Sequence, residues 1–103
     1  MNSLEKQVLY YSLFAFYQSL LTNKQIKYFT NYFIDNLSLQ EIATLQNVSR
    51  NAVHDSLQKV ITLLTNYESK LQLYKRYKKR QKIYEKYTEK YDFIKQLQLI
   101  DKI

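Results

Sequence analysis

A short polar stretch between residues 50 and 59 carries the side chains best suited to recognising another molecule. Guanidinium and amide groups make paired hydrogen bonds to the edges of bases, and lysine neutralises phosphate. Residues three or four apart share one face of a helix, so a helical stretch would present most of these groups together. The candidate nucleic-acid-binding residues are Arg50, Asn51, His54, Gln58 and Lys59.

A second candidate site is the basic run that follows Tyr74. Its cations could hold the backbone of RNA or DNA, while Tyr74, Tyr77 and Tyr84 could stack on unpaired bases. Tyrosine at helical spacing also packs against neighbouring helices, and we favour packing for these three. The run itself is equally compatible with solvent and with nucleic acid. Its basic residues are Lys75, Arg76, Lys78, Lys79, Arg80 and Lys82.

No combination of residues in the sequence predicts an enzyme. A phosphate-binding loop needs glycine, which the chain lacks, and the absence of cysteine excludes disulfides and thiolate metal sites. His54 is the single histidine, and we expect it to be an ordinary exposed or capping side chain. Asp35, Asp55 and Glu68 are too scattered to form a catalytic pair. We therefore expect a non-enzymatic protein without cofactor or metal.

The composition predicts an all-α protein of one domain. The 103 residues contain neither glycine nor proline, on which most tight turns depend, and 46% of them are hydrophobic, enough for a core. No stretch reaches the roughly 18 apolar residues of a membrane span, and the N-terminus has no targeting signal. We expect a cytoplasmic protein with no membrane partner.

The net charge of +7 is unevenly distributed along the chain. Residues 1–66 hold five basic and four acidic side chains, a net charge of +1, whereas residues 67–103 hold eleven basic and five acidic, a net charge of +6. Phosphate neutralisation supplies most of the non-specific affinity for nucleic acid. The stretch from Arg50 to Lys59 therefore lies in a nearly neutral part, and Asp55 weakens its case further.

Apolar and aromatic residues predict a first helix from Leu4 to Leu21, because they recur at steps of three and four residues. The apolar face of this helix is broader than one stripe, which favours contact with other helices or with a second subunit. A homodimer is one way to cover it. The capping-box pair Thr22 and Gln25 then starts a second helix, which ends near residues 35–36.

A helix-turn-helix motif follows at residues 38–64. Ser38 and Glu41 form a second capping box for a short helix, and Asn47 is the candidate for a left-handed turn residue. Ser49 caps the would-be recognition helix, whose apolar residues repeat from Val53 onwards on one face. We expect a helix-turn-helix domain at 1–73 and a basic, Lys- and Tyr-rich helical extension at 74–103. The basic run could continue a helix, break between two helices, or fray.

These motifs resemble those of the YlxM-type helix-turn-helix proteins, which look like region 4 of a bacterial sigma factor with extra helices. The resemblance covers residues 4 to about 73. It therefore implies an all-α, sigma region 4-like helix-turn-helix bundle, to which the residues themselves add an aromatic N-terminal helix and a long basic C-terminal helical tail. Its main elements are Leu21-Thr22 followed by Gln25, Tyr32-Phe33, the segments 37–43 and 48–55, and Leu63-Leu64 before Tyr67-Glu68.

Members of that family are encoded beside the GTPase of the bacterial signal recognition particle. The resemblance therefore implies a regulatory or accessory role in that pathway, through contact with its GTPase or its RNA. The alternative is a sequence-specific DNA-binding transcriptional regulator that uses the motif, and a third possibility is a purely structural interaction module. The sequence departs from the family pattern at Asn47, where glycine is usual, and in its unusually Lys- and Tyr-rich tail, whose function the resemblance leaves open.

Overall fold

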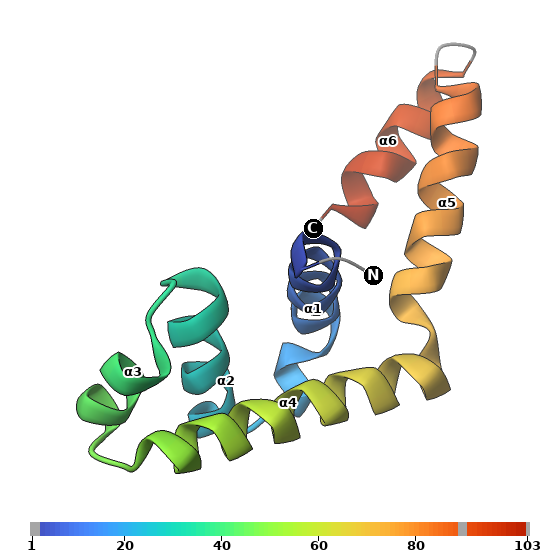
Figure 1. Cartoon of the computed structure of the whole chain (residues 1–103). Coiled ribbons are helices and arrows are strands. Elements are labelled where there is room, and N and C mark those ends of the chain that lie inside the picture. The colour runs from blue at the N-terminus through green and yellow to red at the C-terminus, as the bar shows by residue number, and fades with distance from the viewer. Residues whose placement is uncertain (1–2, 89–90, 103) are drawn as a thin grey trace.

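The computed structural model describes residues 3–88 and 91–102, and this part of the chain folds into helices without a strand (Figure 1). The all-α prediction is therefore confirmed. No helix among the described residues is long and apolar enough to cross a membrane. The elements are α1 (Ser3–Tyr17), the 3₁₀ turn η1 (Gln18–Leu20), α2 (Asn23–Phe29), the π-helical turn η2 (Thr30–Ile34), α3 (Leu39–Gln46), α4 (Arg50–Leu71), α5 (Leu73–Tyr87) and α6 (Asp92–Asp101).

Side-chain caps start the helices where the sequence predicted them. At α2, Thr22 Oγ1 accepts from the Gln25 N–H at 3.1 Å while the Thr22 N–H donates to Gln25 Oε1 at 2.9 Å. Ser38 and Glu41 make the same reciprocal pair at α3, with both distances 3.0 Å. Ser49 Oγ accepts from the Ala52 N–H at the start of α4. Each cap satisfies backbone donors that the helix itself leaves unpaired.

Three turns among the described residues contain a residue with left-handed backbone, the conformation that glycine most often adopts. Asn36, Asn47 and Gln72 have φ of 57°, 55° and 56°. Asparagine tolerates this conformation, and Asn47 ends α3 as predicted. Gln72 carries no such signal, yet it separates α4 from α5. The break in the C-terminal helices therefore falls before the basic run, and the run itself is helical.

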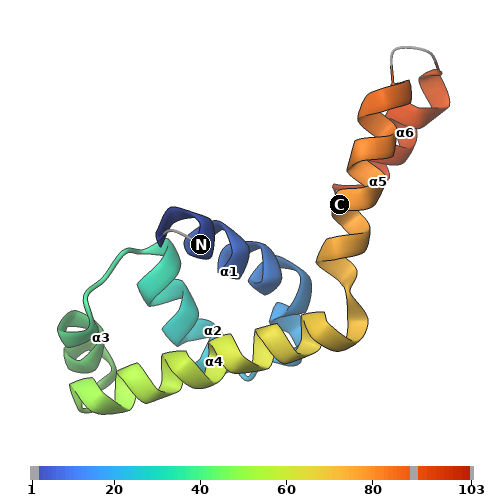
Figure 2. The same cartoon turned by 45° about the vertical axis from the view of Figure 1, so that its right-hand side comes forward.

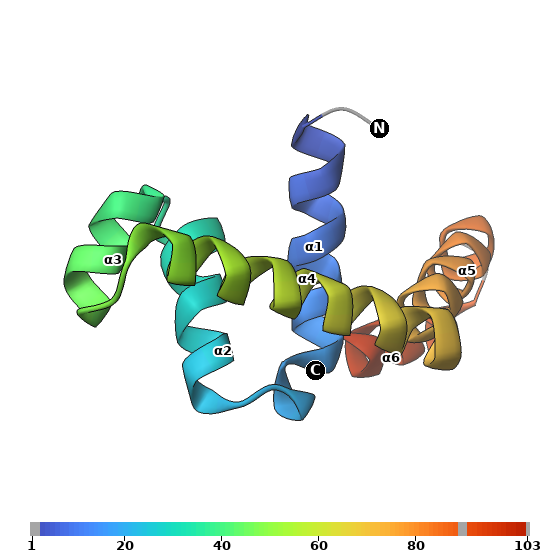
Figure 3. The ribbon, with the colours of Figure 1, turned by 60° about the horizontal axis from the view of Figure 1, so that its bottom comes forward.

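α4 is the element against which the N-terminal helices pack (Figure 3). Its residues Val60 and Leu64 contribute to one buried cluster with α1 and α2, and Val53 and Leu57 to a second with Ile42 and Ala43 of α3. The small Ala43 lets α3 and α4 approach closely at the helix-turn-helix. The inward positions predicted for the recognition helix are confirmed.

Two helices end in geometry other than a regular α-helix, although the second ends close to residues 35–36 as predicted. The first α-helix ends at Tyr17, and a 3₁₀ turn extends from there to Leu20 before α2 begins. The second helix ends in a π turn, in which the Asp35 N–H reaches back to the Thr30 carbonyl at 2.9 Å. Aromatic packing accompanies this turn: the Phe29 ring stacks on Phe33 with centroids 4.5 Å apart.

The C-terminal helices form a hairpin that projects from the rest of the molecule (Figure 2). α6 folds back along α5: the Thr88 hydroxyl donates to Gln98 Oε1 at 3.1 Å, and Ile94 of α6 is buried. The radius of gyration is 16.8 Å, against about 13 Å for a compact chain of 100 residues. The hairpin thus holds much of its surface in solvent.

Candidate nucleic-acid interface

The first turns of α4 present exposed polar side chains. Arg50 and Asn51 are exposed just after the Ser49 cap, and they lie where a recognition helix contacts base edges. The His54 and Asp55 side chains are 56% and 83% exposed, with Nδ1 and Oδ1 3.5 Å apart. Asp55 places a negative charge inside this polar surface. The local charge therefore gives little attraction for phosphate.

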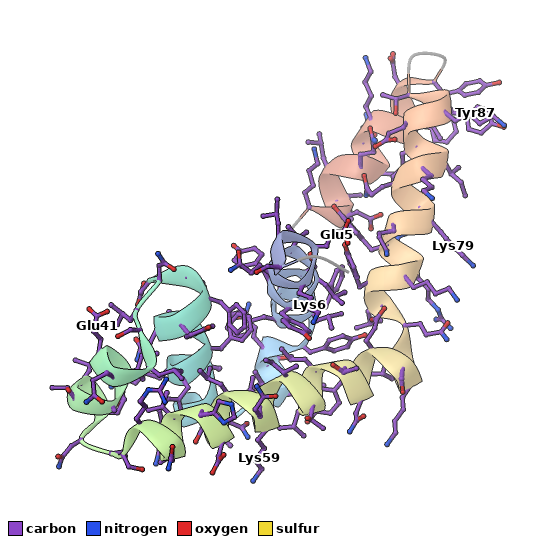
Figure 4. The ribbon with its side chains drawn as sticks, in the orientation of Figure 1. Glu5, Lys6, Glu41, Lys59, Lys79 and Tyr87 are labelled. Atoms are coloured by element: carbon purple, nitrogen blue, oxygen red, sulfur yellow. The ribbon has the colours of Figure 1, made fainter. Side chains whose placement is uncertain are left out.

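The five recognition-helix candidates do not share one surface. At 3.6 residues per turn, Arg50, Asn51, His54 and Gln58 fall within about 100° of the α4 circumference, and Lys59 lies about 80° beyond them. His54 and Gln58 line a hollow against α1, whereas Lys59 lines a separate hollow near the start of α2. Figure 4 shows Lys59 directed away from α1.

Five exposed lysines lie along one side of α5, and we call this surface the lysine face. They occupy about 100° of the helix circumference and extend over about 16 Å of its axis. Figure 4 shows Lys79 pointing away from α6 and α1. Glu85 is an acidic side chain at one border. The lysine face consists of Lys75, Lys78, Lys79, Lys82 and Lys86.

The lysine face differs from the basic run read in the sequence. Arg80 turns away from it, and its Nε donates to Asp101 Oδ2 at 2.9 Å, which holds α6 to α5. The hydrogen bond from Arg80 lowers the pKa of the Asp101 carboxyl. Arg76 is exposed at the opposite border, and Lys86 joins the face. Its spacing of four residues from Lys82 was a usable signal that the sequence prediction missed.

The opposite side of α5 packs against α1 through aromatic rings. The Phe16 ring centroid lies 6.1 Å from that of Tyr74 and 5.4 Å from that of Tyr77. Lys78 Nζ sits 4.4 Å from the Tyr74 ring centroid, a cation–π contact at the border of the lysine face. Tyr74 and Tyr77 are thus packing residues, as the sequence favoured, and they direct the lysine face outward.

Glu68 sets the direction of α5, a role that the sequence analysis did not predict. Its Oε1 accepts from the Tyr17 hydroxyl at 2.6 Å and from the Tyr74 N–H at 3.1 Å, and Oε2 accepts from the Lys75 N–H at 3.1 Å. A carboxylate at a helix N-terminus accepts hydrogen bonds from N–H groups that the helix leaves unpaired, and its negative charge interacts favourably with the helix dipole. The Leu73 N–H donates to the Tyr17 oxygen at 3.0 Å. Burial raises the pKa of the Tyr17 hydroxyl.

The packing of α3 against α4, with three further helices supporting α4, defines a helix-turn-helix protein. Within residues 3–88 and 91–102, no group of three or more His, Cys, Asp or Glu side chains is placed to hold a metal ion.

Comparison with known proteins identifies the family. Residues 4–103 match the model of UPF0122, the YlxM / p13 like helix-turn-helix proteins. The chain is 48% identical over 80 residues to a UPF0122 protein of Staphylococcus epidermidis, covering 78% of this chain and 73% of the relative. It is 47% identical over 79 residues to UPF0122 protein YlxM of Bacillus subtilis, covering 77% and 72%. The chain belongs to the UPF0122 family, which confirms the resemblance.

Proposed function

We propose that this protein is a non-enzymatic accessory factor of the signal recognition particle pathway that binds the RNA of the particle through the lysine face. Family membership supports nucleic-acid binding, and the resemblance to YlxM-type proteins supports the pathway. The observation that carries the proposal is the alignment of five exposed lysines on α5. In the same scheme, residues 1–73 are the helix-turn-helix domain and residues 74–103 are its RNA-binding extension.

Lysines on a rigid helix suit a phosphate backbone better than a base edge. Each ammonium is a compact charge without the planar geometry that reads a base, so such contacts are independent of sequence. Neutralising five phosphates gives a slope of log K against log salt of about −3.5 for single strands and about −4.5 for a duplex. The aromatic packing beneath α5 keeps the lysines in fixed register.

The test is binding of the signal recognition particle RNA, measured by fluorescence anisotropy between about 50 and 200 mM salt. The triple variant Lys75→Gln/Lys79→Gln/Lys82→Gln should weaken binding more than tenfold and reduce the salt slope by two to three, each value an order-of-magnitude expectation. The control Lys24→Gln/Lys27→Gln/Lys95→Gln removes the same charge from exposed sites elsewhere. Equal losses in both variants, or no binding at low salt, would reject the lysine face.

The GTPase of the particle and a second copy of this chain are further proposed partners. The surface of α1 supports a homodimer. Leu4, Val8 and Tyr11 lie on successive turns of this helix and are 68%, 55% and 54% exposed. An exposed apolar stripe of this kind often marks a protein contact. Retention of the GTPase after nuclease treatment would support direct protein contact, whereas its loss would leave RNA as the link.

The alternative function is sequence-specific DNA binding through α4. The observation in its favour is the exposure of Arg50 and Asn51 in the first turn of the recognition helix. Selection of duplexes from a random pool tests it, with Arg50→Ala and Asn51→Ala as the variants. Unchanged sequence selectivity in both variants would remove this alternative, because direct base contacts contribute about 1–3 kcal/mol each.

A further inference from the structure

A hollow of about 230 Å³ lies between the N-terminal half of α1, the η2 turn and the first half of α4. It is separate from the lysine face, which belongs to α5 at the other end of α4 (Figure 1). Drug-sized ligands occupy pockets of roughly 300–1,000 Å³, so this hollow suits a smaller group such as one planar ring system. The residues that carry the argument are Lys6, Gln7, Tyr10, Tyr32, His54 and Gln58.

The lining combines flat aromatic surface with hydrogen-bonding groups. The rings of Tyr10 and Tyr32 both meet Phe33 edge to face, with centroids 6.0 and 4.9 Å away. Gln7 and Gln58 contribute amides from two different helices, which can each donate and accept. Aromatic faces with nearby amides are the means by which proteins bind unpaired bases. The lining therefore matches both the faces and the edge of a nucleobase.

Charge favours an anionic group at the same place. Lys6 lines the hollow and lies on α1 (Figure 4), and His54 lines it from α4. The Asp55 carboxylate lies 3.5 Å from the His54 ring, so the positive side of the hollow is the α1 side. A phosphate attached to a bound base would consequently meet Lys6.

The η2 turn is the second feature that marks this hollow. π turns are rare in proteins, and those that occur are often found at functional sites. The extra residue in the turn changes the directions of the nearby side chains. Here it carries both Tyr32 and Phe33, which line the hollow, and Tyr32 keeps 39% of its surface exposed. Phe33 meanwhile stacks on the buried Phe29. Tyr32 thus offers the hollow an exposed ring, while Phe33 lines the hollow and also anchors the turn to the core.

We propose that this hollow binds one unstacked nucleobase together with its phosphate. Tyr10 and Tyr32 contact the base, Gln7 and Gln58 bond to its edge, and Lys6 holds the phosphate. His54 and Gln58, which the sequence assigns to the reading of nucleic acid by the recognition helix, act here inside a pocket that α1 completes. The base comes either from a free mononucleotide or from a single strand.

Titration followed by amide NMR shifts tests the site, with AMP, UMP, single-stranded tetranucleotides of the same bases, and inorganic phosphate as probes. Nucleotides should shift the amides of residues 6–10, 32–33 and 54–58. Tyr32→Leu should raise the dissociation constant about tenfold, since stacking on one aromatic ring has an effect of this order. Tyr32→Phe keeps the ring and should retain binding. Tyr87→Leu is the control, a tyrosine of similar exposure on α5.

The outcomes separate the possibilities. If AMP or UMP binds, a free mononucleotide is sufficient to occupy the hollow. If only the tetranucleotides bind, the hollow takes a base that belongs to a single strand. Phosphate binding as tight as AMP would overturn the base site and leave a simple anion contact. Absence of shifts in the named amides at millimolar nucleotide would also overturn it. The triple lysine variant should still bind at the hollow, so failure of the lysine face and failure of this site are distinguishable.

Discussion

The Tyr17 hydroxyl lies 2.6 Å from Glu68 Oε1, which joins the end of α1 to the last turns of α4 across 51 positions of sequence. The same carboxylate accepts N–H groups from the first turn of α5. One acidic side chain therefore connects three helices at the place where the chain changes direction. This junction fixes the position of α5, and with it the lysine face, relative to the helix-turn-helix.

Removing the Tyr17 hydroxyl should destabilise the protein. Tyr17→Phe leaves the ring in the core but takes one donor from Glu68 and one acceptor from the Leu73 N–H. We expect the free energy of unfolding to fall by about 1–3 kcal/mol, because the lost bond to the Glu68 carboxylate is charge-assisted and the Leu73 N–H loses its side-chain acceptor. Urea denaturation measures it. Tyr32→Phe, at an exposed tyrosine, should change it by less than about 0.5 kcal/mol; equal effects would contradict the junction.

Gln72 should tolerate glycine better than an ordinary helical position does. The left-handed φ of 56° at Gln72 is strained for a residue with a Cβ, by about 1–2 kcal/mol, and glycine removes that strain. We expect Gln72→Gly to leave the thermal midpoint unchanged or raised. Gln96→Gly, inside α6, should lose about 0.5–1 kcal/mol of stability. A larger loss at residue 72 than at residue 96 would argue against a left-handed junction.

Acid should release α6 from α5. The hydrogen bond from Arg80 lowers the pKa of Asp101 from its ordinary value of 3.8, so this carboxylate stabilises the hairpin at pH values above 3.8. That contribution is lost as the pH falls through the lowered pKa of the folded state. The protection of the α6 amides from hydrogen exchange, relative to the intrinsic rate at each pH, should therefore fall below about pH 4.

The variant Asp101→Asn is the control for this acid effect. It removes the titrating carboxylate, so α6 should exchange faster already at neutral pH and lose the Asp101 component of its response to acid. An acid response as large in Asp101→Asn as in the parent protein would assign the effect to other groups. The hydrogen bond from the Ser38 N–H lowers the pKa of the Glu41 carboxyl. This second acid-sensitive carboxyl belongs to α3, so its effect can be followed separately from that of Asp101.

The exposed stripe on α1 should control self-association. Val8→Lys places a charge in the middle of the stripe at a position that is 55% exposed, so the monomer should remain folded. Light scattering at micromolar concentration should change from a dimer to a monomer. Ile83→Lys provides an equally exposed control on α5 and should leave the dimer intact. A parent protein that is already monomeric would contradict the homodimer.

Local chemistry determined much of the helix-turn-helix from the sequence. The capping pairs Thr22–Gln25 and Ser38–Glu41 and the cap at Ser49 each involve residues within three positions, so their geometry follows once a helix begins. Asn47 could be predicted as left-handed because few other side chains tolerate that turn. The apolar period of α4 likewise predicted its buried side.

Tertiary structure decided the features that depend on distant partners. Glu68 is an ordinary surface-type residue in the sequence, and it becomes the cap of α5 because α1 brings Tyr17 to it. Arg80 belongs to a run of cations, yet α6 returns Asp101 to its side and removes it from the lysine face. The hollow beside α4 likewise requires α1 and the π turn. Short-range periodicity determines how each helix forms, whereas packing between segments far apart in sequence determines which side chains are left available for binding.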